Sequence, residues 1–357
     1  MDSRKSELLQ AGRFAVQRCG RWRGPLVAVF VLGLLAIACG GDEEPAALTG
    51  QRTTISLALL DDPGRRAALY AIEQGIVTSD SVDVNLTYLP LSAISDAASA
   101  RQYDAVETAA VTVAQAAAAG FEFIVLSAGL QDLDGTFLFV RADSDVAGPG
   151  DLRGKTVAVA SVGGTPGLET RYLLMEGYGL DVSPEGGDVT FIESPGESLP
   201  ALLRDGEVDA AVVQHLGAFQ LLEDGDFRVL SHVAEEVRAL AGTPAMDSIL
   251  VTYPEVAEQK SQLLSELNRL MAESVTYFRA NREDVIQAVA AEQEVDPEFL
   301  RWWWERHELP LGDLSVEVLG GLQAVWEAAK ALGDVEGYPD LATVVFNPEA
   351  VTPTPGD

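Results

Sequence analysis

The feature that most constrains the fold of this 357-residue chain is a regular alternation of short apolar runs with longer amphipathic segments. Short runs rich in β-branched residues predict strands, and the longer segments predict helices. The first expected elements, alternately strand and helix, are 54–59, 64–75, 82–88, 92–101, 105–107, 112–120 and 123–127. Such alternation predicts parallel strands joined by crossover helices, an α/β fold.

The pattern restarts after a further expected strand at 136–141, which predicts a second lobe. Its expected elements are 155–160, 166–177, 189–192, 199–205 and 210–213. The segments Ala98–Val106 and Leu203–Val212 form a pseudo-repeat, because each ends a helix in a polar turn, continues with an Asp and begins a small apolar strand. We therefore expect the two lobes to share one plan.

After a return strand at 248–253 the chain is expected to be helical. The predicted helices are 254–281, 282–293, 297–307 and 315–332. The first carries apolar residues at helical spacing, which predicts one face packed on a lobe. These residues are Leu263, Leu264, Leu267, Leu270, Met271, Val275 and Phe278.

The start of the chain has the pattern of a secretion signal. An arginine-rich flank precedes the apolar run Pro25–Ala38, which is too short for a comfortable membrane span. Cys39 follows at once, and the arrangement resembles the lipobox of bacterial lipoproteins, in which the thiol is acylated and becomes the mature N-terminus. The usual leucine three positions before the cysteine is Ala36 here. The alternative is a plain signal peptide or short anchor with an incidental cysteine.

Charge and cysteine usage exclude several classes of function. Residues 1–38 contain six Lys/Arg and two Asp/Glu, so the remainder contains 18 basic and 53 acidic residues, a net charge of −35. Such an acidic body argues against nucleic acid and anionic lipid as partners. Cys19 lies in the presumed signal, so no disulfide or thiolate metal cluster is expected after it. With only three histidines, we expect no metal and no cofactor.

The predicted organisation has five parts. Residues 1–38 form a lipoprotein signal peptide, 39–52 a flexible tether and 351–357 a disordered tail. Lobe 1 is discontinuous, from 53–142 and 244–350, and lobe 2 spans 143–243. The segments 136–143 and 248–253 are the expected crossovers between them.

Three motifs carry a resemblance to a known family. These motifs occur in the order and at the spacing seen in solute-binding lipoproteins of bacterial ABC importers. They are Ala68–Ile76 with the strand after it, Asp151–Val159 and Gly206–Val212. The chain specifically resembles their nitrate, sulfonate, taurine and thiamine-precursor group. This resemblance implies a two-lobed type II periplasmic-binding-protein-like fold with two crossover strands, C-terminal helices packed on lobe 1, and closure on a ligand like a hinged clamp.

The resemblance also implies a function. The protein is expected to be a monomer, lipid-anchored through Cys39 on the extracytoplasmic side of the membrane. It would capture a small organic or anionic solute and deliver it to an ABC permease and ATPase, without enzyme activity. The alternatives are a receptor lobe for a signalling partner and a pyrimidine-precursor enzyme on the same fold. The secretion signal argues against the enzyme, and no nucleophile elbow of a hydrolase is present.

Ligands of open α/β sheets bind beyond the carboxyl ends of strands, which selects the candidate contacts. In the first such loop they are Asp61, Asp62 and Arg65, although Asp62 could instead cap a helix that begins at Pro63. The second loop offers Thr108 and Ala109 at a helix start. Glu107, beside them, is either a ligand carboxylate or a satisfied charge.

The second lobe supplies the other candidates. Ser161, Gly163, Gly164 and Thr165 belong to a glycine-rich turn whose amides could approach a carboxylate, sulfonate or phosphate, unless Thr165 simply caps the following helix. Gln214 and His215 follow a buried strand, and His215 is either a cleft residue or a structural one. Segment 243–247 is expected to line the hinge.

Charged residues and tryptophans near these loops have their own expected roles. Arg65 and Arg171 are the only nearby cations for an anionic solute, while the abundant acids leave room for an amine. Within the second lobe's first helix, Glu169 and Arg171 are expected to pair or to face solvent. Of Trp302–Trp304, one or two are expected to anchor the C-terminal helix, with Trp326 in a similar role, because consecutive helical residues point in different directions.

Overall fold

The computed structural model describes residues 52–351, and the expected signal peptide, most of the tether and most of the tail lie outside them. The first sheet has the strand order β2-β1-β3-β12-β4. Strands β1, β2 and β3 are mutually parallel, and β12 runs antiparallel to β3 and β4. Its strands are β1 (Thr53–Leu60), β2 (Val82–Leu89), β3 (Ala105–Ala109), β4 (Ile124–Ala128) and β12 (Ser248–Thr252).

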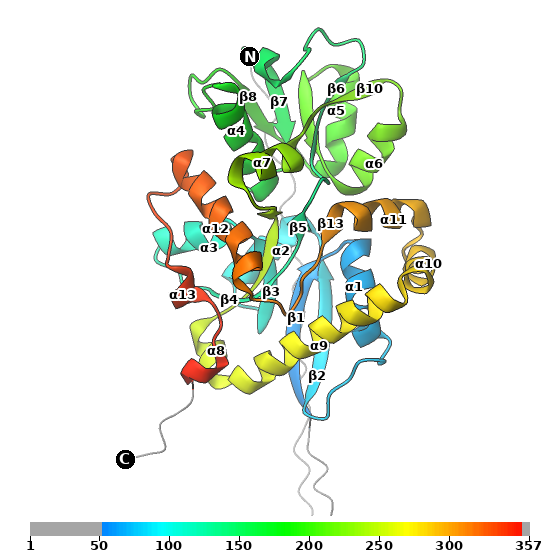
Figure 1. Cartoon of the computed structure of the whole chain (residues 1–357), viewed down its shortest axis with the longest axis vertical. Coiled ribbons are helices and arrows are strands. Elements are labelled where there is room, and N and C mark those ends of the chain that lie inside the picture. Colours follow the sequence, from blue (N-terminus) through cyan, green and yellow to red (C-terminus); the bar gives the residue numbers. More distant parts are fainter. Residues whose placement is uncertain (1–51, 352–357) are drawn as a thin grey trace, which may run out of the picture. The chain divides into compact units, whose positions relative to one another are not determined.

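Helices cover both faces of the first sheet (Figure 1). One face packs against α1 (Pro63–Glu73), α9 (Ser261–Ala280), α10 (Arg282–Gln293) and α11 (Pro297–Arg306). The other packs against α2 (Leu91–Ser99), α3 (Thr112–Ala118) and α12 (Val316–Ala331). The short elements α8 (Pro254–Gln259), α13 (Leu341–Val344) and η3 (Pro348–Val351) complete this part of the chain.

The second sheet has the order β10-β6-β9-β7-β8, with β7, β8 and β9 parallel and β6 antiparallel to β9 and β10. Its strands are β6 (Phe137–Arg141), β7 (Thr156–Val159), β8 (Thr190–Glu193), β9 (Ala210–Val213) and β10 (Phe227–His232). Its helices are η1 (Pro149–Leu152), α4 (Thr165–Tyr178), η2 (Gly196–Ser198), α5 (Leu199–Asp205), α6 (His215–Glu223) and α7 (Val233–Ala241). Glycines in the left-handed conformation end α4 and α5, at Gly179 (φ 64°) and Gly206 (φ 71°).

The two sheets share one plan, as the pseudo-repeat predicts. In each, three parallel strands are followed in the sheet order by one antiparallel strand and then an edge strand. The repeated aspartates also make the same bond. Asp104 accepts from the backbone N–H of Ser56 in β1 (2.9 Å), and Asp209 accepts from that of Thr156 in β7 (2.8 Å). The α/β fold class is therefore confirmed.

The connections between the sheets differ from the prediction. A small third sheet, in the order β11-β5-β13, joins β5 (Gln131–Asp132), β11 (Ala245–Met246) and β13 (His307–Glu308). The chain leaves the first sheet through β5 and returns through β11. The expected crossovers 136–143 and 248–253 instead supply β6 of the second sheet and β12 of the first, so the expected boundary after residue 142 falls too late. Two-residue strands have no periodic pattern that a sequence could reveal.

One prediction about the C-terminal helices needs correction. The helix expected at 254–281 is two helices, α8 and α9, which are separated at Lys260 (φ −121°). The expected apolar face of α9 is buried against α1 and the first sheet. The expected packing of the C-terminal helices on the first sheet is observed, and α11 also contacts α6 and α12 also contacts α4.

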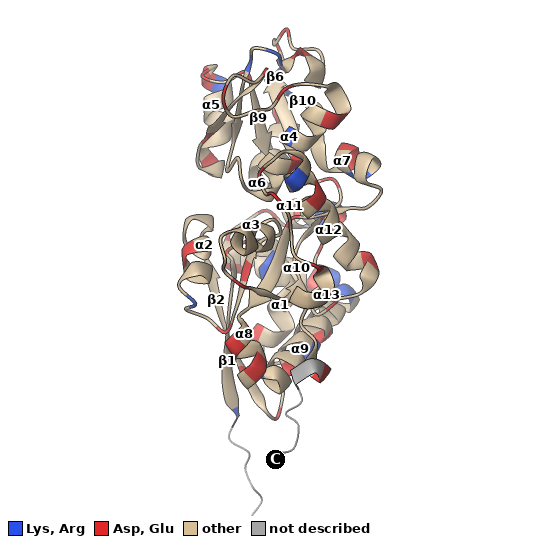
Figure 2. Cartoon of the chain, turned by 90° about the vertical axis from the view of Figure 1, so that its left-hand side faces the viewer, with Lys and Arg blue, Asp and Glu red and all other residues tan. Residues whose placement is uncertain are grey.

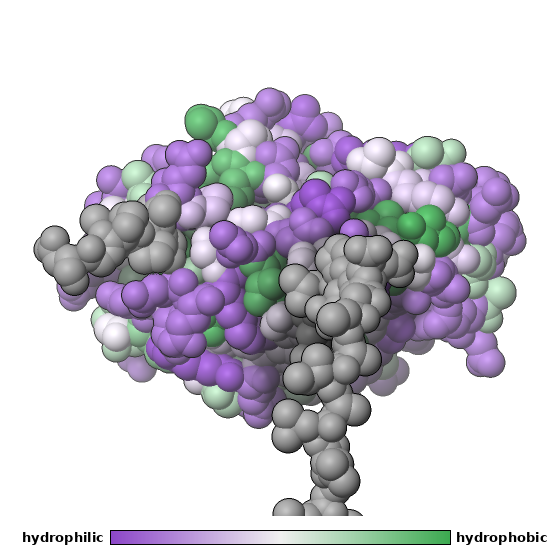
Figure 3. Space-filling view, turned by 90° about the horizontal axis from the view of Figure 1, so that it is seen from below, coloured by the Kyte–Doolittle hydropathy of each residue, from purple (hydrophilic) through white to green (hydrophobic). Residues whose placement is uncertain are grey.

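The surface reflects the acidic composition. Acidic residues are spread over helices of both sheets (Figure 2). The face seen in Figure 3 is largely hydrophilic outside the grey atoms, with small, separate apolar areas. None of the helices in residues 52–351 is both long enough and apolar enough to cross a membrane.

Adjacent glycines in α12 provide a test of the packing between α12 and β11. A Cβ at Gly321 would lie 2.5 Å from the carbonyl oxygen of Pro244, whereas a Cβ at Gly320 would meet nothing within 4 Å. We expect Gly321→Ala to lower the free energy of unfolding by about 1–3 kcal/mol. Gly320→Ala should raise it by roughly 0.5–1 kcal/mol, because alanine favours a helix. Urea denaturation measures both, and equal effects would contradict the close contact.

Candidate functional site

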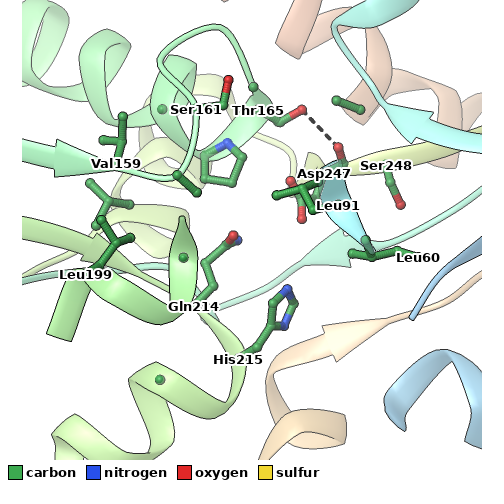
Figure 4. A pocket seen from close by; sticks show the side chains of 18 of the residues that line it. Leu60, Leu91, Val159, Ser161, Thr165, Leu199, Gln214, His215, Asp247 and Ser248 are labelled. Carbon is green, nitrogen blue, oxygen red and sulfur yellow. Dashed lines mark hydrogen bonds between the residues drawn. The ribbon is translucent and has the colours of Figure 1, made fainter. Parts of the chain in front are cut away.

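A pocket of about 450 Å³ lies between elements of the two sheets, at the carboxyl ends of their parallel strands. From the first sheet it is lined by Leu60, Arg65, Leu91, Ile94, Glu107, Thr108, Ala109, Asp247 and Ser248. From the second it is lined mainly by Val159, Ser161, Gly164, Thr165, Leu199, Pro200, Gln214, His215, Leu216 and Gly217. In Figure 4, Gln214 and His215 extend toward Asp247 from the opposite wall.

An ion pair between Arg65 and Glu107 forms the floor of the first-sheet side. Arg65 lies in the first turn of α1, and its Nε and Nη2 donate to Glu107 at 2.7–2.9 Å. Glu107, in β3, also accepts from the backbone N–H of Leu60 and the hydroxyl of Ser248. Burial disfavours the guanidinium charge, but Glu107 and Asp62 outweigh it and raise the pKa of Arg65. Glu107 is thus a satisfied charge.

The expected contacts Asp61 and Asp62 have other roles. The Asp62 carboxylate accepts from the backbone N–H groups of Gly64 (2.8 Å) and Arg65 (3.2 Å), so it caps α1, whose first residue is Pro63. Asp61 pairs with Arg66 at 2.9 Å near the surface. Neither side chain lines the pocket, because local hydrogen bonds hold both of them.

Thr108 and Ala109 do line the pocket, at the end of β3. The Thr108 hydroxyl donates to Thr112 at 3.0 Å, in the first turn of α3. On the opposite side Ser161, Gly164 and Thr165 also line the pocket.

Gly163 does not line the pocket; its carbonyl accepts from Gln115 of α3 at 3.2 Å. Thr165 is the first residue of α4 rather than its cap, and its hydroxyl donates to the backbone carbonyl of Asp247 at 2.9 Å. The glycine-rich turn is therefore bound to first-sheet elements at two points.

Gln214 and His215 stand at the start of α6. His215 adopts φ 52°, a left-handed conformation that is uncommon for a residue with a side chain. The Trp303 indole N–H donates to His215 Nδ1 at 3.0 Å. Burial lowers the pKa of His215 to about 3, and His307 and Arg65 act in the same direction against Asp62. An indole can only donate, so neutral His215 carries its proton on Nε2.

Asp247 joins β11 to β12 and lines the pocket. The sequence predicts only that its segment, 243–247, lines the hinge. The Asp247 side chain accepts a hydrogen bond from Gln214. Burial raises the pKa of Asp247 to about 7; Asp132 and Glu107 add to this, whereas Arg65 and Gln214 oppose it. The Asp247 carboxyl therefore keeps its proton to a higher pH than an exposed aspartate does.

Glu169 and Arg171 of α4 neither pair with each other nor face solvent. Glu169 is buried, and burial together with the charges of Asp132 and Asp247 raises its pKa well above the usual value. Arg171 is buried and pairs with Asp334, both of its oxygens at 2.8 Å. The expectation for these two residues was wrong because α4 lies between the second sheet, α7 and α12.

The apolar walls of the pocket were missed. Leu91 and Ile94 belong to α2, which follows β2, while Leu199 and Pro200 belong to α5, which follows β8. Ligands of open α/β sheets bind beyond the carboxyl ends of strands, and β2 and β8 are such strands, so the sequence signal for these residues is their place directly after them.

The tryptophans serve as anchors, as expected for one or two of the run 302–304. Trp303 and Trp326 are fully buried, and Trp326 Nε1 donates to the Ala110 carbonyl at 2.9 Å. A Cβ at Gly64 would lie 2.6 Å from the Trp303 ring, so α1 and α11 pack closely there.

One group of side chains has the composition of a metal site. Donor atoms of Asp134, His232 and Glu235 all lie within 4.8 Å of one another, and these residues are partly to fully exposed. A hydrogen bond of 2.8 Å between His232 Nδ1 and Asp134 accounts for part of this arrangement without an ion.

Glu107 provides a test of the buried ion pair. Glu107→Gln leaves the Arg65 charge buried, with Asp62 at 3.5 Å as its remaining ion-pair partner. We expect a loss of about 3 kcal/mol in the free energy of unfolding. The control Asp61→Asn removes a carboxylate from an exposed pair and should cost less than about 1 kcal/mol. Denaturant titration measures the free energy of unfolding of both variants. Losses of similar size would contradict the larger contribution of the buried pair.

Comparisons with known proteins agree with this geometry. Residues 81–294 match the family model described as ABC transporter, phosphonate, periplasmic substrate-binding protein. No curated protein matches the chain.

Among solved structures, the periplasmic aliphatic sulphonate binding protein SsuA from Escherichia coli is similar at 17% identity and a TM-score of 0.65, over 85% of this chain and 94% of that one. The alkanesulfonate-binding protein SsuA from Xanthomonas axonopodis pv. citri, bound to MOPS, has 16% identity and a TM-score of 0.63, over 83% and 99%. A Candida albicans protein with the generic periplasmic binding protein fold has 12% identity and a TM-score of 0.66, over 82% and 96%.

The expected family resemblance and two-lobed fold are confirmed by these findings. The family model covers more than half of the chain, and the neighbours share the fold. The chain therefore belongs to the phosphonate family of periplasmic substrate-binding proteins and is an extracytoplasmic solute-binding component of an ABC import system.

Proposed function

We propose that this protein captures a small organic solute in the pocket between its two sheets and is held at the membrane by lipid on Cys39. The observation that carries the proposal is the pocket itself, which combines an apolar wall with polar side chains from both sheets. Its volume of about 450 Å³ suits a small molecule. Binding and release, without chemistry, are the proposed activity.

The proposed ligand contacts are the sequence candidates that line the pocket, together with Asp247. They are Arg65, Thr108, Ala109, Ser161, Gly164, Thr165, Gln214, His215 and Asp247. Because these residues come from both sheets, a ligand that touches both favours the arrangement in which the walls are close. Such a change is what a permease could recognise.

A solute screen tests the function. Purified residues 40–357 contain the compact unit Gly50–Asp357 and would be heated with sulfonates, nitrate, amino acids, polyamines and pyrimidines. A ligand at about 100 times its dissociation constant should add about 2.7 kcal/mol of stability. No shift with any solute, together with turnover of one of them, would refute a binding protein.

A matched pair of variants locates the binding. Ala109 lines the pocket and Ala118 is exposed at the end of α3. Ala109→Phe should abolish the thermal shift by filling the pocket, whereas Ala118→Phe should keep it. Circular dichroism of both variants would check that each is folded.

The proposed anchor has a separate test. Acyl chains contribute about 0.8 kcal/mol per buried methylene, so several chains hold a protein durably on a membrane. Cys39, which lies outside the described residues, is the proposed acylation site. Cys39→Ala should release the protein from membranes or block its processing, as measured by fractionation and intact mass. Membrane retention of a fully cleaved mutant would contradict the proposal.

A further inference from the structure

The charges around the pocket do not suit an anion. Arg65 is the only Lys or Arg among the described residues that line it. Its guanidinium is paired bidentately with Glu107 and lies 3.5 Å from Asp62. Two carboxylates therefore surround this single cation, and a third, Asp247, lines the pocket beside them. Arg171, the other cation considered for an anionic solute, is paired with Asp334 and does not line the pocket.

Asp247 is the carboxyl group best placed to meet a ligand. Its backbone is fixed, because its N–H donates to the Leu130 carbonyl at 2.8 Å and its own carbonyl accepts from Ala110 and Thr165. Glu107 accepts four hydrogen-bond donors, whereas the Asp247 side chain accepts from Gln214. In Figure 4, Asp247 lies at the centre of the pocket wall, between Thr165 and Ser248.

The other residues that line the pocket limit the kind of cation that it can bind. Four leucines line the pocket and are together called the leucine wall. They are Leu60, Leu91, Leu199 and Leu216. No Phe, Tyr or Trp occurs among the pocket's described lining residues, so the cation–π contacts with these rings that hold quaternary ammonium groups are missing. An ammonium group with N–H protons instead finds acceptors in the Asp247 carboxylate and the Thr108 hydroxyl.

We propose that the solute is a primary amine with an apolar body, whose ammonium group pairs with the Asp247 carboxylate while its hydrocarbon part lies against the leucine wall. This inference rests on the proposed solute-binding function. A sulfonate or phosphonate would enter a site where Asp247 and Glu107 repel it and where Arg65 must first leave Glu107. Uncoupling a buried charge from its partner is unfavourable by several kcal/mol.

Matched probes test the head group directly. Hexylamine, hexanol and hexane-1-sulfonate share one apolar body and differ in charge. Isothermal titration calorimetry of the mature protein at about pH 8 should show hexylamine binding about 10- to 100-fold more tightly than hexanol, because a charged hydrogen bond is added. Hexane-1-sulfonate should bind most weakly.

Two variants locate the interaction. Asp247→Asn keeps the shape of the side chain and removes its charge, so it should reduce hexylamine affinity to that of hexanol. Asp61→Asn removes a nearby carboxylate that pairs with Arg66 outside the pocket, so affinity should be unchanged. Burial disfavours the Asp247 charge, so Asp247→Asn should unfold at the same or higher urea concentration than the native protein at about pH 8.

The pH dependence gives a second readout. The groups that influence Asp247 are Arg65, Glu107, Asp132, Glu169 and the amide of Gln214. Protonated Asp247 cannot pair with an ammonium group, and its pKa is about 7. Hexylamine affinity should therefore fall by up to about tenfold per unit as the pH drops below this value. In Asp247→Asn the affinity should vary much less with pH.

Several outcomes would overturn the inference. Tighter binding of hexane-1-sulfonate than of hexylamine would show that the pocket takes anions, and would leave the solute-binding function standing. Equal affinity for hexylamine and hexanol, or no effect of Asp247→Asn, would remove the role of the carboxylate. No shift with any solute in the wider thermal screen, together with turnover of one of them, would instead refute the proposed function itself.

Discussion

The ion pair between Arg65 and Glu107 is the interaction on which the arrangement of the first sheet's loops depends. Arg65 lies in the first turn of α1 and Glu107 lies in the middle of β3, and the same carboxylate accepts from the Leu60 N–H at the end of β1 and the Ser248 hydroxyl at the start of β12. One buried pair thus links three neighbouring strands and one helix. It also neutralises the cation that an anionic ligand would need, so the contact that shapes the pocket also restricts what the pocket can take.

A second constraint is the repetition of one plan. Asp104 and Asp209 each hold the backbone of the neighbouring parallel strand, and each has a lysine nearby, Lys260 at 2.6 Å and Lys155 at 3.5 Å. The same order of strands places the carboxyl ends of both parallel sets at one pocket. Contacts such as Thr165 with Asp247 and Trp303 with His215 then join elements of the two sheets.

The sequence predicts what local patterns determine. The cap at Asp62 with Pro63 specifies the start of α1, and 199–205, 210–213 and 282–293 are found with the predicted bounds. Long-range partners leave no such local pattern. Nothing near Arg65 indicates that Glu107 will neutralise it, and the α4 residues Glu169 and Arg171 look like surface charges until α12 is seen to pack against that helix. The α/β class and the strand-end loops were therefore predictable, whereas the sign of the charge available to a ligand was not.

The selectivity proposed for the pocket depends on groups that are held by neighbouring residues. The Asp247 backbone is held by Leu130, Ala110 and Thr165, and the tautomer of His215 is set by the indole of Trp303. A ligand without a matching group therefore meets a carboxylate and an imidazole whose places in the pocket are set by the protein. It would leave a carboxylate or an imidazole N–H unpaired in a partly desolvated site, which costs more than the loss of one ordinary hydrogen bond. Discrimination between solutes of similar size therefore arises less from the apolar contacts they share than from the polar groups that a wrong solute leaves unsatisfied.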